Sequence, residues 1–480
     1  MSDHASATLP RNSGQPGRRY VIRGGTVMSL DPAVGDFETA DVLVEGTKIV
    51  AVGPRIDAPD TDEIDARGRV VMPGFVDTHH HLFETGLRSF LPNGLLLNDG
   101  SGTPSADPSY MEYIIGRFAP AYRPQDVHIN MLYGRLSQLD AGVTTVLDTS
   151  QIHHTPEHSD AAVQALADAG ARSVVGYWPG DGRADSRHPE DARRLRTQYF
   201  SSADQLLTLA MGGEVAGGPD YAAVWTLARE LDLQIAAHAL GFMMEPVLQG
   251  LARGDNGIAF GPDVLFIHMV HISDAVWQAA RDAGVRVSLA VPIEMAMRHG
   301  TPPLMKMQQL GMEPSLSSDV ETTMTADPFT LMRSTLTLQR MLANEHVFAQ
   351  PRRGPEDIWP TPADDAPALL LDRDVLRFAT LNGATDLRLG ARTGSLTPGK
   401  EADIVLLDAT ALNVAPMNSA PGAVVTLMDR SNVESVIVAG KIRKWQGTLL
   451  DADLPRLRTE LEASRDHLFA ATGIKQQLFP

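Results

Sequence analysis

Two histidines near the start of the chain have the spacing of metal ligands. His79 and His81 lie two residues apart in the apolar stretch 70–81. Alternate residues of an extended strand point to the same face of a sheet. Two imidazoles on one face can hold a metal ion from one side, and imidazole suits zinc, iron, nickel and cobalt. A histidine tag would be the trivial explanation, but this cluster lies in mid-chain, so we predict a metal site.

A repeating pattern along the middle of the chain indicates the elements that position these histidines. Longer amphipathic segments, such as 160–169, 221–231 and 274–283, separate most of the short apolar runs and predict helices. Strands that alternate with helices predict a parallel sheet, and eight of them predict a closed (β/α)8 TIM barrel. An open doubly wound sheet is the alternative, and the lack of a Gly-x-Gly-x-x-Gly motif after the first strand weakens it. The predicted strands are residues 70–76, 143–147, 173–177, 206–211, 234–238, 264–268, 285–290 and 315–319.

Strand-like segments also lie at both ends of the chain. Residues 40–52 alternate around a turn as a hairpin does, and residues 401–408 and 433–445 have strand composition. A lone hairpin is marginal in water, so we expect both ends to build one domain. The predicted α/β architecture is a disordered tail at 1–19, a composite β-sandwich of 20–68 plus 394–447, a metal-dependent barrel at 69–393 and a helical tail at 448–480.

Three further polar residues end apolar runs of the predicted barrel. His238, His268 and Asp319 close the fifth, sixth and eighth predicted strands. Reactive groups of such barrels lie at the carboxyl ends of the strands. A lone buried histidine is more often structural than a ligand, and a lone aspartate could cap a helix. Their joint occurrence with the first-strand pair favours one site over several unrelated roles.

With these residues, the chain resembles members of the amidohydrolase superfamily. The stretches that carry the resemblance are residues 73–81, 237–238, 267–271 and 317–319. The chain is most similar to the branch that holds cytosine-deaminase-like and triazine-hydrolase-like enzymes, and residues 297–303 and 315–321 resemble a subgroup that includes molinate hydrolase.

The resemblance implies a role for each residue. His79, His81 and His238 would bind the metal, and Asp319 would be the fourth ligand and accept a proton from the bound water. His268 would polarise the substrate. A metal with an open position binds water and lowers its pKa to roughly 7, so that hydroxide forms at neutral pH.

The resemblance also bears on the number of metal ions. Binuclear members use a carboxylated lysine, but no lysine lies between Lys48 and Lys306. Glu214 could bridge two metals, although we expect a solvated loop charge there. We predict one divalent ion, with zinc as the default and iron, manganese or cobalt as alternatives.

One departure from the deaminases of this branch concerns a glutamate that protonates the substrate ring. They carry it three residues after the fifth-strand histidine, where this chain has Gly241. Glu294 and Glu245 are candidate substitutes, and we take Glu294 as a catalytic residue. Candidate substrate contacts are His154, Leu96 and Met295.

The predicted function is therefore hydrolysis of a carbon–nitrogen bond other than a peptide bond, in an amide, cyclic amide, urea or thiocarbamate-like compound. The alternative is a deaminase or dechlorinating hydrolase of an amino-heterocycle such as a triazine, pyrimidine or purine. A barrel scaffold that has lost its chemistry is a minor alternative.

Composition limits the partners. The formal net charge of -18 disfavours nucleic acid and anionic membranes, and the absence of cysteine excludes disulfides and thiolate ligands. The first 19 residues hold no apolar signal segment, and no apolar run has membrane-spanning length. We expect a cytoplasmic enzyme with a small-molecule substrate. The apolar residues 95–97 favour a homo-oligomer.

Overall fold

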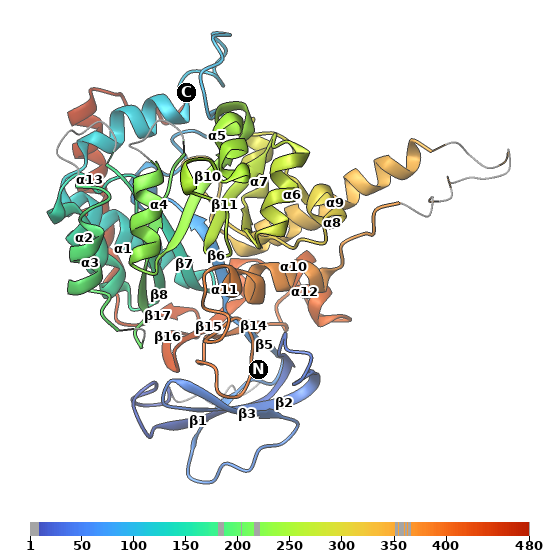
Figure 1. Ribbon diagram of the computed structural model, residues 1–480. Coiled ribbons are helices and arrows are strands. Elements are labelled where there is room, and N and C mark those ends of the chain that lie inside the picture. The colour runs from blue at the N-terminus through green and yellow to red at the C-terminus, as the bar shows by residue number, and fades with distance from the viewer. Residues whose placement is uncertain are drawn as a thin grey trace.

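The computed structural model describes residues 9–180, 187–202, 204–215, 221–350, 354, 360, 362 and 366–479. None of the described helices combines the length and the apolar character needed to cross a membrane. Two sheets organise the chain, and they lie one above the other in Figure 1.

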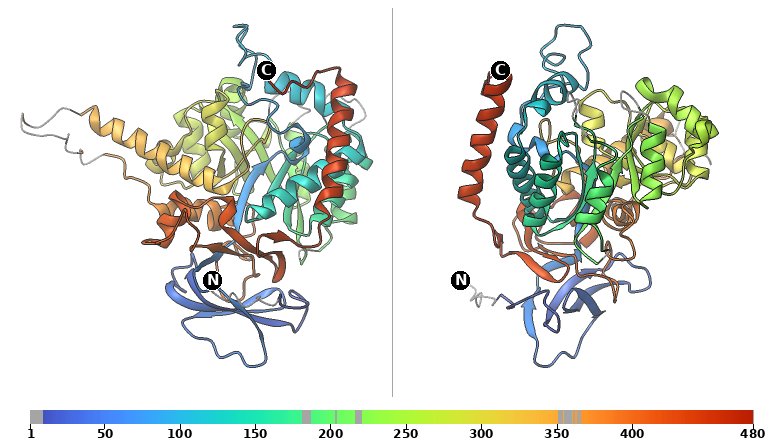
Figure 2. Two further views of the ribbon diagram at one scale, coloured as in Figure 1. Left: turned by 180° about the vertical axis from the view of Figure 1, so that it is seen from behind. Right: turned by 60° about the vertical axis from the view of Figure 1, so that its left-hand side comes forward.

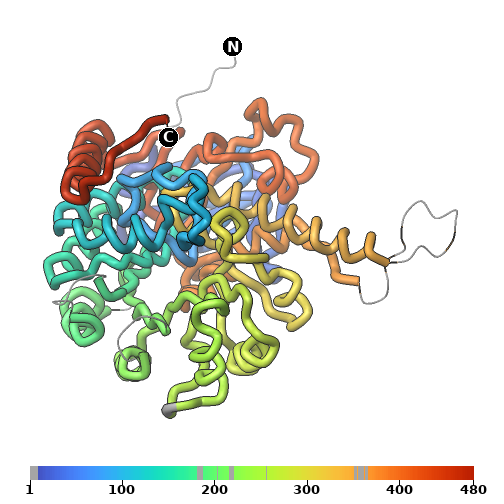
Figure 3. The backbone as a smooth tube through the Cα atoms, turned by 90° about the horizontal axis from the view of Figure 1, so that it is seen from above, coloured from blue at the N-terminus to red at the C-terminus, as the bar shows by residue number. Residues whose placement is uncertain are grey.

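Eight parallel strands form the upper sheet, in strict chain order. The sheet curls until the segment after its last strand pairs with the end of its first strand, through a bridge between His80 and Asp319. Seen from above, successive units follow one another round a ring, from teal through green to yellow (Figure 3). This arrangement confirms the predicted barrel. Its strands are β6 (Phe75–His80), β7 (Val143–Ser150), β8 (Arg172–Tyr177), β9 (Leu207–Gly212), β10 (Gln234–Leu240), β11 (Val264–Val270), β12 (Arg286–Leu289) and β13 (Ser315–Leu316).

Helices connect and cover these strands. Gly170 shows how the sequence ends one of them, because its backbone adopts a left-handed φ of 61° directly after α2, a conformation that glycine adopts without strain. The helices are α1 (Pro124–Asp140), α2 (Pro156–Ala169), α3 (Ala192–Gln198), α4 (Tyr221–Glu230), α5 (Gly241–Arg253), α6 (Asp274–Asp282), α7 (Val291–Ala296), α8 (Leu304–Gln309), α9 (Pro328–Phe348), α10 (Asp372–Arg377), α11 (Gly383–Asp386), α12 (Ala420–Thr426) and α13 (Leu454–Thr472).

The lower sheet has nine strands and draws on both ends of the chain, as predicted. Its centre is the antiparallel pair of β5 and β14, which joins the N-terminal strands to the C-terminal ones. The strands are β1 (Arg19–Met28), β2 (Asp36–Glu45), β3 (Lys48–Gly53), β4 (Asp62–Asp65), β5 (Arg69–Pro73), β14 (Ile404–Asp408), β15 (Val433–Val438), β16 (Lys441–Trp445) and β17 (Thr448–Leu449).

The first barrel strand differs from the predicted run of residues 70–76. Residues up to Pro73 pair with the lower sheet, and the barrel strand begins at Phe75. Gly74 lies between them, and a Cβ atom there would overlap the side chain of Thr144. The chain therefore crosses from one sheet to the other at Gly74, where only glycine fits. The sequence is apolar on both sides of this residue, so the boundary between the two strands could not be predicted from the pattern.

Segments near both ends of the chain pack against the body of the molecule. Residues 1–8 of the predicted tail lie outside the described residues, but Leu9 packs against the core of the lower sheet. The hydroxyl of Ser13 accepts a hydrogen bond from the backbone of Ile442. At the other end, α13 runs along the outside of the barrel (Figure 2) and contacts α1.

Candidate active site

The carboxyl end of β6 presents the first two imidazoles. His79 is completely buried and His81 is nearly so. Nδ1 of His79 lies 2.9 Å from Oγ1 of Thr149, and Nδ1 of His81 lies 3.0 Å from Oε1 of Gln151. Both partners come from the end of β7, the neighbouring strand. The hydrogen bonds at Nδ1 leave Nε2 of each ring available for another contact.

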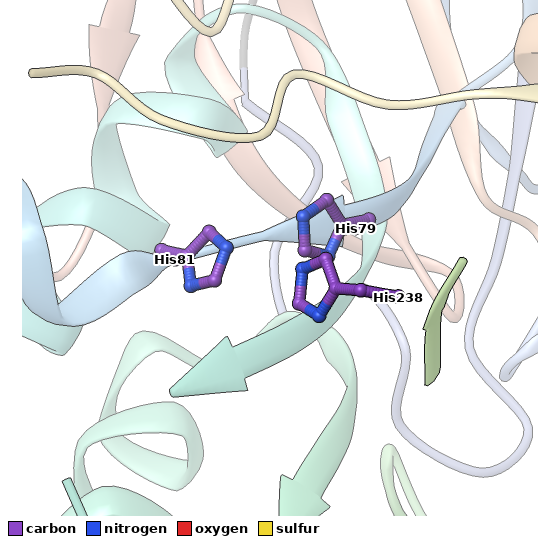
Figure 4. Close-up of side chains that lie close together, drawn as sticks. All are labelled: His79, His81 and His238. Carbon is purple, nitrogen blue, oxygen red and sulfur yellow. The ribbon is translucent and has the colours of Figure 1, made fainter. Parts of the chain in front are cut away.

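A third imidazole comes from β10. His238 faces His79 and His81 in Figure 4, with ring centres 4.9 and 5.8 Å from theirs. Its Nδ1 lies 2.6 Å from Oε1 of Glu214, which also accepts a hydrogen bond of 2.7 Å from the indole of Trp178. The expectation of a solvated charge at Glu214 is wrong, because the carboxylate faces the neighbouring strand and fixes the ring of His238.

Asp319 is held beside β6 by its backbone. Its N–H donates to the carbonyl of His79 over 3.0 Å, and the N–H of His81 donates to the carbonyl of Asp319 over 2.9 Å. Oδ1 of the carboxylate lies 3.0 Å from Nε2 of His79 and 3.4 Å from Nε2 of His81. The φ of Asp319 is +60°, a left-handed conformation that non-glycine residues adopt at a cost, often at functional sites.

The fourth imidazole, His268, lies on the other side of the carboxylate. Its Nε2 is 3.7 Å from Oδ2 of Asp319. Its Nδ1 is 3.0 Å from Oε1 of Glu294, and that oxygen also accepts a hydrogen bond from the backbone of Ala290. Burial raises the pKa of Glu294 well above its usual range. A neutral carboxyl group can donate its proton to Nδ1, which leaves the ring hydrogen of His268 on Nε2.

The charges of the site are set by burial and by mutual contact. Burial lowers the pKa of His79 well below 6.5 and that of His268 to about 4. Burial alone would raise the pKa of Asp319, but the imidazoles of His79, His81 and His268 hold it well below its usual range. The site thus combines an ionised carboxylate at Asp319 with neutral imidazoles at His79 and His268, protonation states that suit metal binding. Burial alone would lower the pKa of His238, but the Glu214 carboxylate raises it above its usual value.

Two overlapping sets of these side chains could hold a metal ion. Each residue of a set offers one ligand atom, and the atoms of a set lie within 4.8 Å of one another. The sets are His79, His81 and His238, and His79, His268 and Asp319.

A cavity of about 350 Å³ opens over these side chains. Polar atoms reach it from His81, His238, His268, Asp319, Gln151, Glu214 and His299. The rest of the wall is largely apolar, and comes from Leu96, Tyr110, Met111, Ile115, Trp178, Pro179, Leu240, Met243, Met244, Met297 and Val320.

The structure separates the predicted substrate contacts. Leu96 lines the cavity, and its contact with a substrate stays a prediction. His154 does not line the cavity, because its Nε2 is turned to the carbonyl of Ala119, 2.8 Å away, in the packing around α2. Met295, on α7, is 53% exposed and is not part of the cavity wall, whereas Met297, directly after α7, lines the cavity.

Glu294 also differs from expectation, and Gly241 is closely packed. Glu294 is completely buried behind His268 and does not line the cavity, so it reaches the site only through that ring. At Gly241, a Cβ atom would overlap the backbone carbonyl of His271. The position at which the resemblance implied a glutamate in deaminases is therefore closed to any side chain on this backbone.

The comparisons with known proteins agree with this architecture. A family model described as the amidohydrolase family matches residues 70–443. The 5'-deoxyadenosine deaminase of Methanosarcina mazei is 25% identical over 462 residues, covering 94% of this chain and 98% of that protein. The 5-methylthioadenosine/S-adenosylhomocysteine deaminase of Symbiobacterium thermophilum is 27% identical over 446 residues, covering 88% and 93%.

Solved structures share the fold. A zinc-bound adenosine deaminase from Xanthomonas campestris superimposes with a TM-score of 0.76 at 22% identity, covering 95% of this chain and 99% of that one. Atrazine chlorohydrolase from Arthrobacter aurescens, complexed with zinc, gives a TM-score of 0.73 at 22% identity, covering 93% and 100%. The family match spans most of the chain and confirms the resemblance predicted from the sequence: the chain belongs to the amidohydrolase family.

Proposed function

We propose that this chain is a hydrolase with one divalent metal ion, and that it cleaves a carbon–nitrogen bond other than a peptide bond. The observation that carries the proposal is the convergence of His79, His81, His238 and Asp319, from β6, β10 and the segment after β13, at the mouth of one barrel. A divalent ion held in this way supplies a water molecule whose pKa is lowered to roughly 7.

The donor set fits such an ion. Each of the three imidazoles uses Nδ1 for an oxygen of a neighbouring residue, namely Thr149, Gln151 or Glu214. Metal-ligating histidines usually make this second contact, which orients the ring and directs the other nitrogen to the metal. Three imidazoles and a carboxylate suit zinc. Two of the solved relatives contain zinc, so we favour zinc among the candidate metals.

The remaining roles follow from the charges of two residues. Asp319 stays ionised, so it can accept a proton from the attacking water and pass it to the leaving nitrogen. His268 is neutral, and a hydrogen bond donated by the Glu294 carboxyl group to its Nδ1 would place the ring hydrogen on Nε2, which faces Asp319. From there it can donate a hydrogen bond to the carbonyl oxygen or ring nitrogen of the substrate and stabilise the negative charge that develops.

Deamination of an amino-heterocycle is the second candidate, because the curated relatives are named as nucleoside deaminases. The apolar wall and the closed position at Gly241 favour a substrate with an apolar body over a nucleoside. Cytoplasmic location and a homo-oligomeric state stay predictions.

Metal analysis of the purified protein tests the proposal. We expect about one divalent ion per chain, loss of activity on chelation, recovery with zinc, and little metal in the His79→Ala variant. Full activity of a metal-free preparation would contradict the proposal.

A substrate panel separates the two candidate reactions. Cytosine, 5'-deoxyadenosine and atrazine represent the heterocycles, and N-alkyl amides, ureas and thiocarbamates represent open bonds. We expect turnover in the second group. Release of ammonia from cytosine or 5'-deoxyadenosine with kcat/KM above about 10⁴ M⁻¹s⁻¹, a typical enzymatic value, would decide for deamination.

A further inference from the structure

One polar side chain of the cavity wall has no role in the site described so far. His299 follows α7 and lines the cavity, although only 3% of its surface is exposed. Its ring centre lies 4.8 Å from that of His268, with an angle of 50° between the rings. His299 is therefore a neighbour of His268, whose Nε2 faces Asp319.

His299 has unused hydrogen-bonding capacity. Its Nδ1 is buried without a partner, and among the described residues no hydrogen bond joins either ring nitrogen. A buried polar group without a hydrogen-bond partner has an energetic cost in the folded protein. A leucine or phenylalanine would fill the same space without that cost. Burial, with His268 close by, lowers the pKa of His299 to about 3, so the ring is neutral and unpaired near the reacting groups.

The backbone around His299 is held firmly. The carbonyl of Met297 accepts a hydrogen bond of 3.1 Å from the backbone of Leu96, and Arg298 forms an ion pair with Asp99. Gly300 has a φ of +133°, and a Cβ atom there would overlap the ring of His271. These constraints hold the His299 imidazole, which makes no hydrogen bond within the described part of the chain, in the wall of the cavity.

We infer that His299 is a substrate-binding residue, which pairs with a heteroatom of the planar group that contains the scissile carbon–nitrogen bond. The inference rests on the proposed function. His268 and His299 would then present two neighbouring imidazoles to one planar N–C–O or N–C–N group, while the apolar wall receives the rest of the molecule. A substrate of this class has a compact amide-like or amidine-like head on an apolar body.

Binding of benzohydroxamate to the cobalt(II)-loaded protein tests this inference without turnover. The probe joins a metal-binding, amide-like head to an apolar ring, and the visible spectrum of cobalt reports its binding. We expect His299→Phe to raise the Kd by about tenfold or more, as the loss of one hydrogen bond to a buried polar group does. We expect His299→Gln, which keeps a donor, to recover most of the affinity.

The outcomes separate the inference from the function on which it rests. An equal Kd for the wild type and His299→Phe would overturn the inference alone, and so would loss of cobalt from both variants, since His299 would then support the metal ligands. A wild-type protein that takes up no cobalt would overturn the proposed function. His128→Phe serves as the control, because His128 pairs with Asp168 on the outer helices, and its Kd should match the wild type.

Discussion

Glu294 and His268 form a buried pair. The carboxyl group lies 3.0 Å from Nδ1 of the imidazole, on the side of the ring that faces away from Asp319. The ring therefore keeps a fixed orientation, with Nε2 toward Asp319. The carboxyl group that we expected to protonate the substrate instead acts through a second residue. Glu294 therefore affects catalysis by holding the ring of His268 in position.

Removal of this contact should lower activity and leave the metal in place. In Glu294→Leu the ring of His268 loses its anchor, and we expect kcat/KM to fall about 100-fold, within the range for a positioned acid or base. Glu294→Gln keeps a hydrogen-bonding group and should lose less. Metal content and kcat/KM measured together check this, and equal losses in both variants would contradict it.

Asp319 should matter more for turnover than for metal retention. Asp319→Asn keeps an oxygen ligand but removes the ionised group that accepts the proton. We expect kcat to fall by about 10²–10⁴-fold, while the protein still binds metal after loading with excess zinc. Steady-state kinetics on the loaded protein and metal analysis supply the two numbers. Activity within threefold of the wild type would exclude the proton transfer that we assign to Asp319.

Glu214 should set the affinity for the metal through His238. The loss of a carboxylate that orients a ligating histidine typically weakens metal binding 10–100-fold, and we expect this for Glu214→Gln. Competition with a chromophoric chelator measures the affinity. Glu245→Gln is a matched control, since Glu245 contacts Gln249 and the backbone of Ser273 but no predicted ligand. Equal affinities for the two variants would contradict the role of Glu214.

The candidate metal ligands stand out in the sequence because each one ends an apolar run. His238 and Asp319 stand where a packed core would favour valine or isoleucine, and the barrel topology places such positions together. Glu214 follows two glycines and looks like a loop residue, and its contact with His238 depends on the pairing of β9 with β10. The contact of His299 likewise depends on the backbone conformation of residues 298–300, which composition does not specify.

His154 shows the opposite error, because the sequence predicted a contact with the substrate that the structure does not show. It follows a barrel strand, as Gln151 does, but three residues further on the chain has turned toward α2, and the ring reaches the carbonyl of Ala119. A position after a strand therefore does not by itself predict the barrel mouth, since Asp319 reaches it three residues after β13, whereas His154, four residues after β7, does not.

Asp148 should make stability depend on pH. Burial raises its pKa from 3.8 to about 7. A group with a raised pKa in the folded state adds stability below its unfolded pKa, and that stability is lost as the pH rises toward the folded value. We expect the free energy of unfolding of Asp148→Asn to rise relative to that of the wild type between pH 4 and pH 7, by up to roughly 4 kcal/mol. Urea unfolding of the metal-free proteins at both pH values measures the difference, and a constant difference would contradict the assignment.

A buried ion network joins the barrel to the segment that leads into β14. Arg172, at the start of β8, contacts Glu401 over 2.6 Å and Asp403 over 2.7 Å, and its side chain is 1% exposed. Removal of one partner from a buried network leaves the other charges without compensation and costs about 3–5 kcal/mol.

We therefore expect Arg172→Met to lower the free energy of unfolding by that amount, although methionine fills similar space. The additional change Asp403→Asn should recover part of the loss, because it removes a buried charge that has lost its partner. Arg67→Met is the control: the Arg67–Asp65 pair is largely exposed, and such pairs contribute about 0–1 kcal/mol. Urea unfolding at pH 7 compares the three variants. If Arg172→Met costs no more than Arg67→Met, the network does not couple the barrel to the lower sheet.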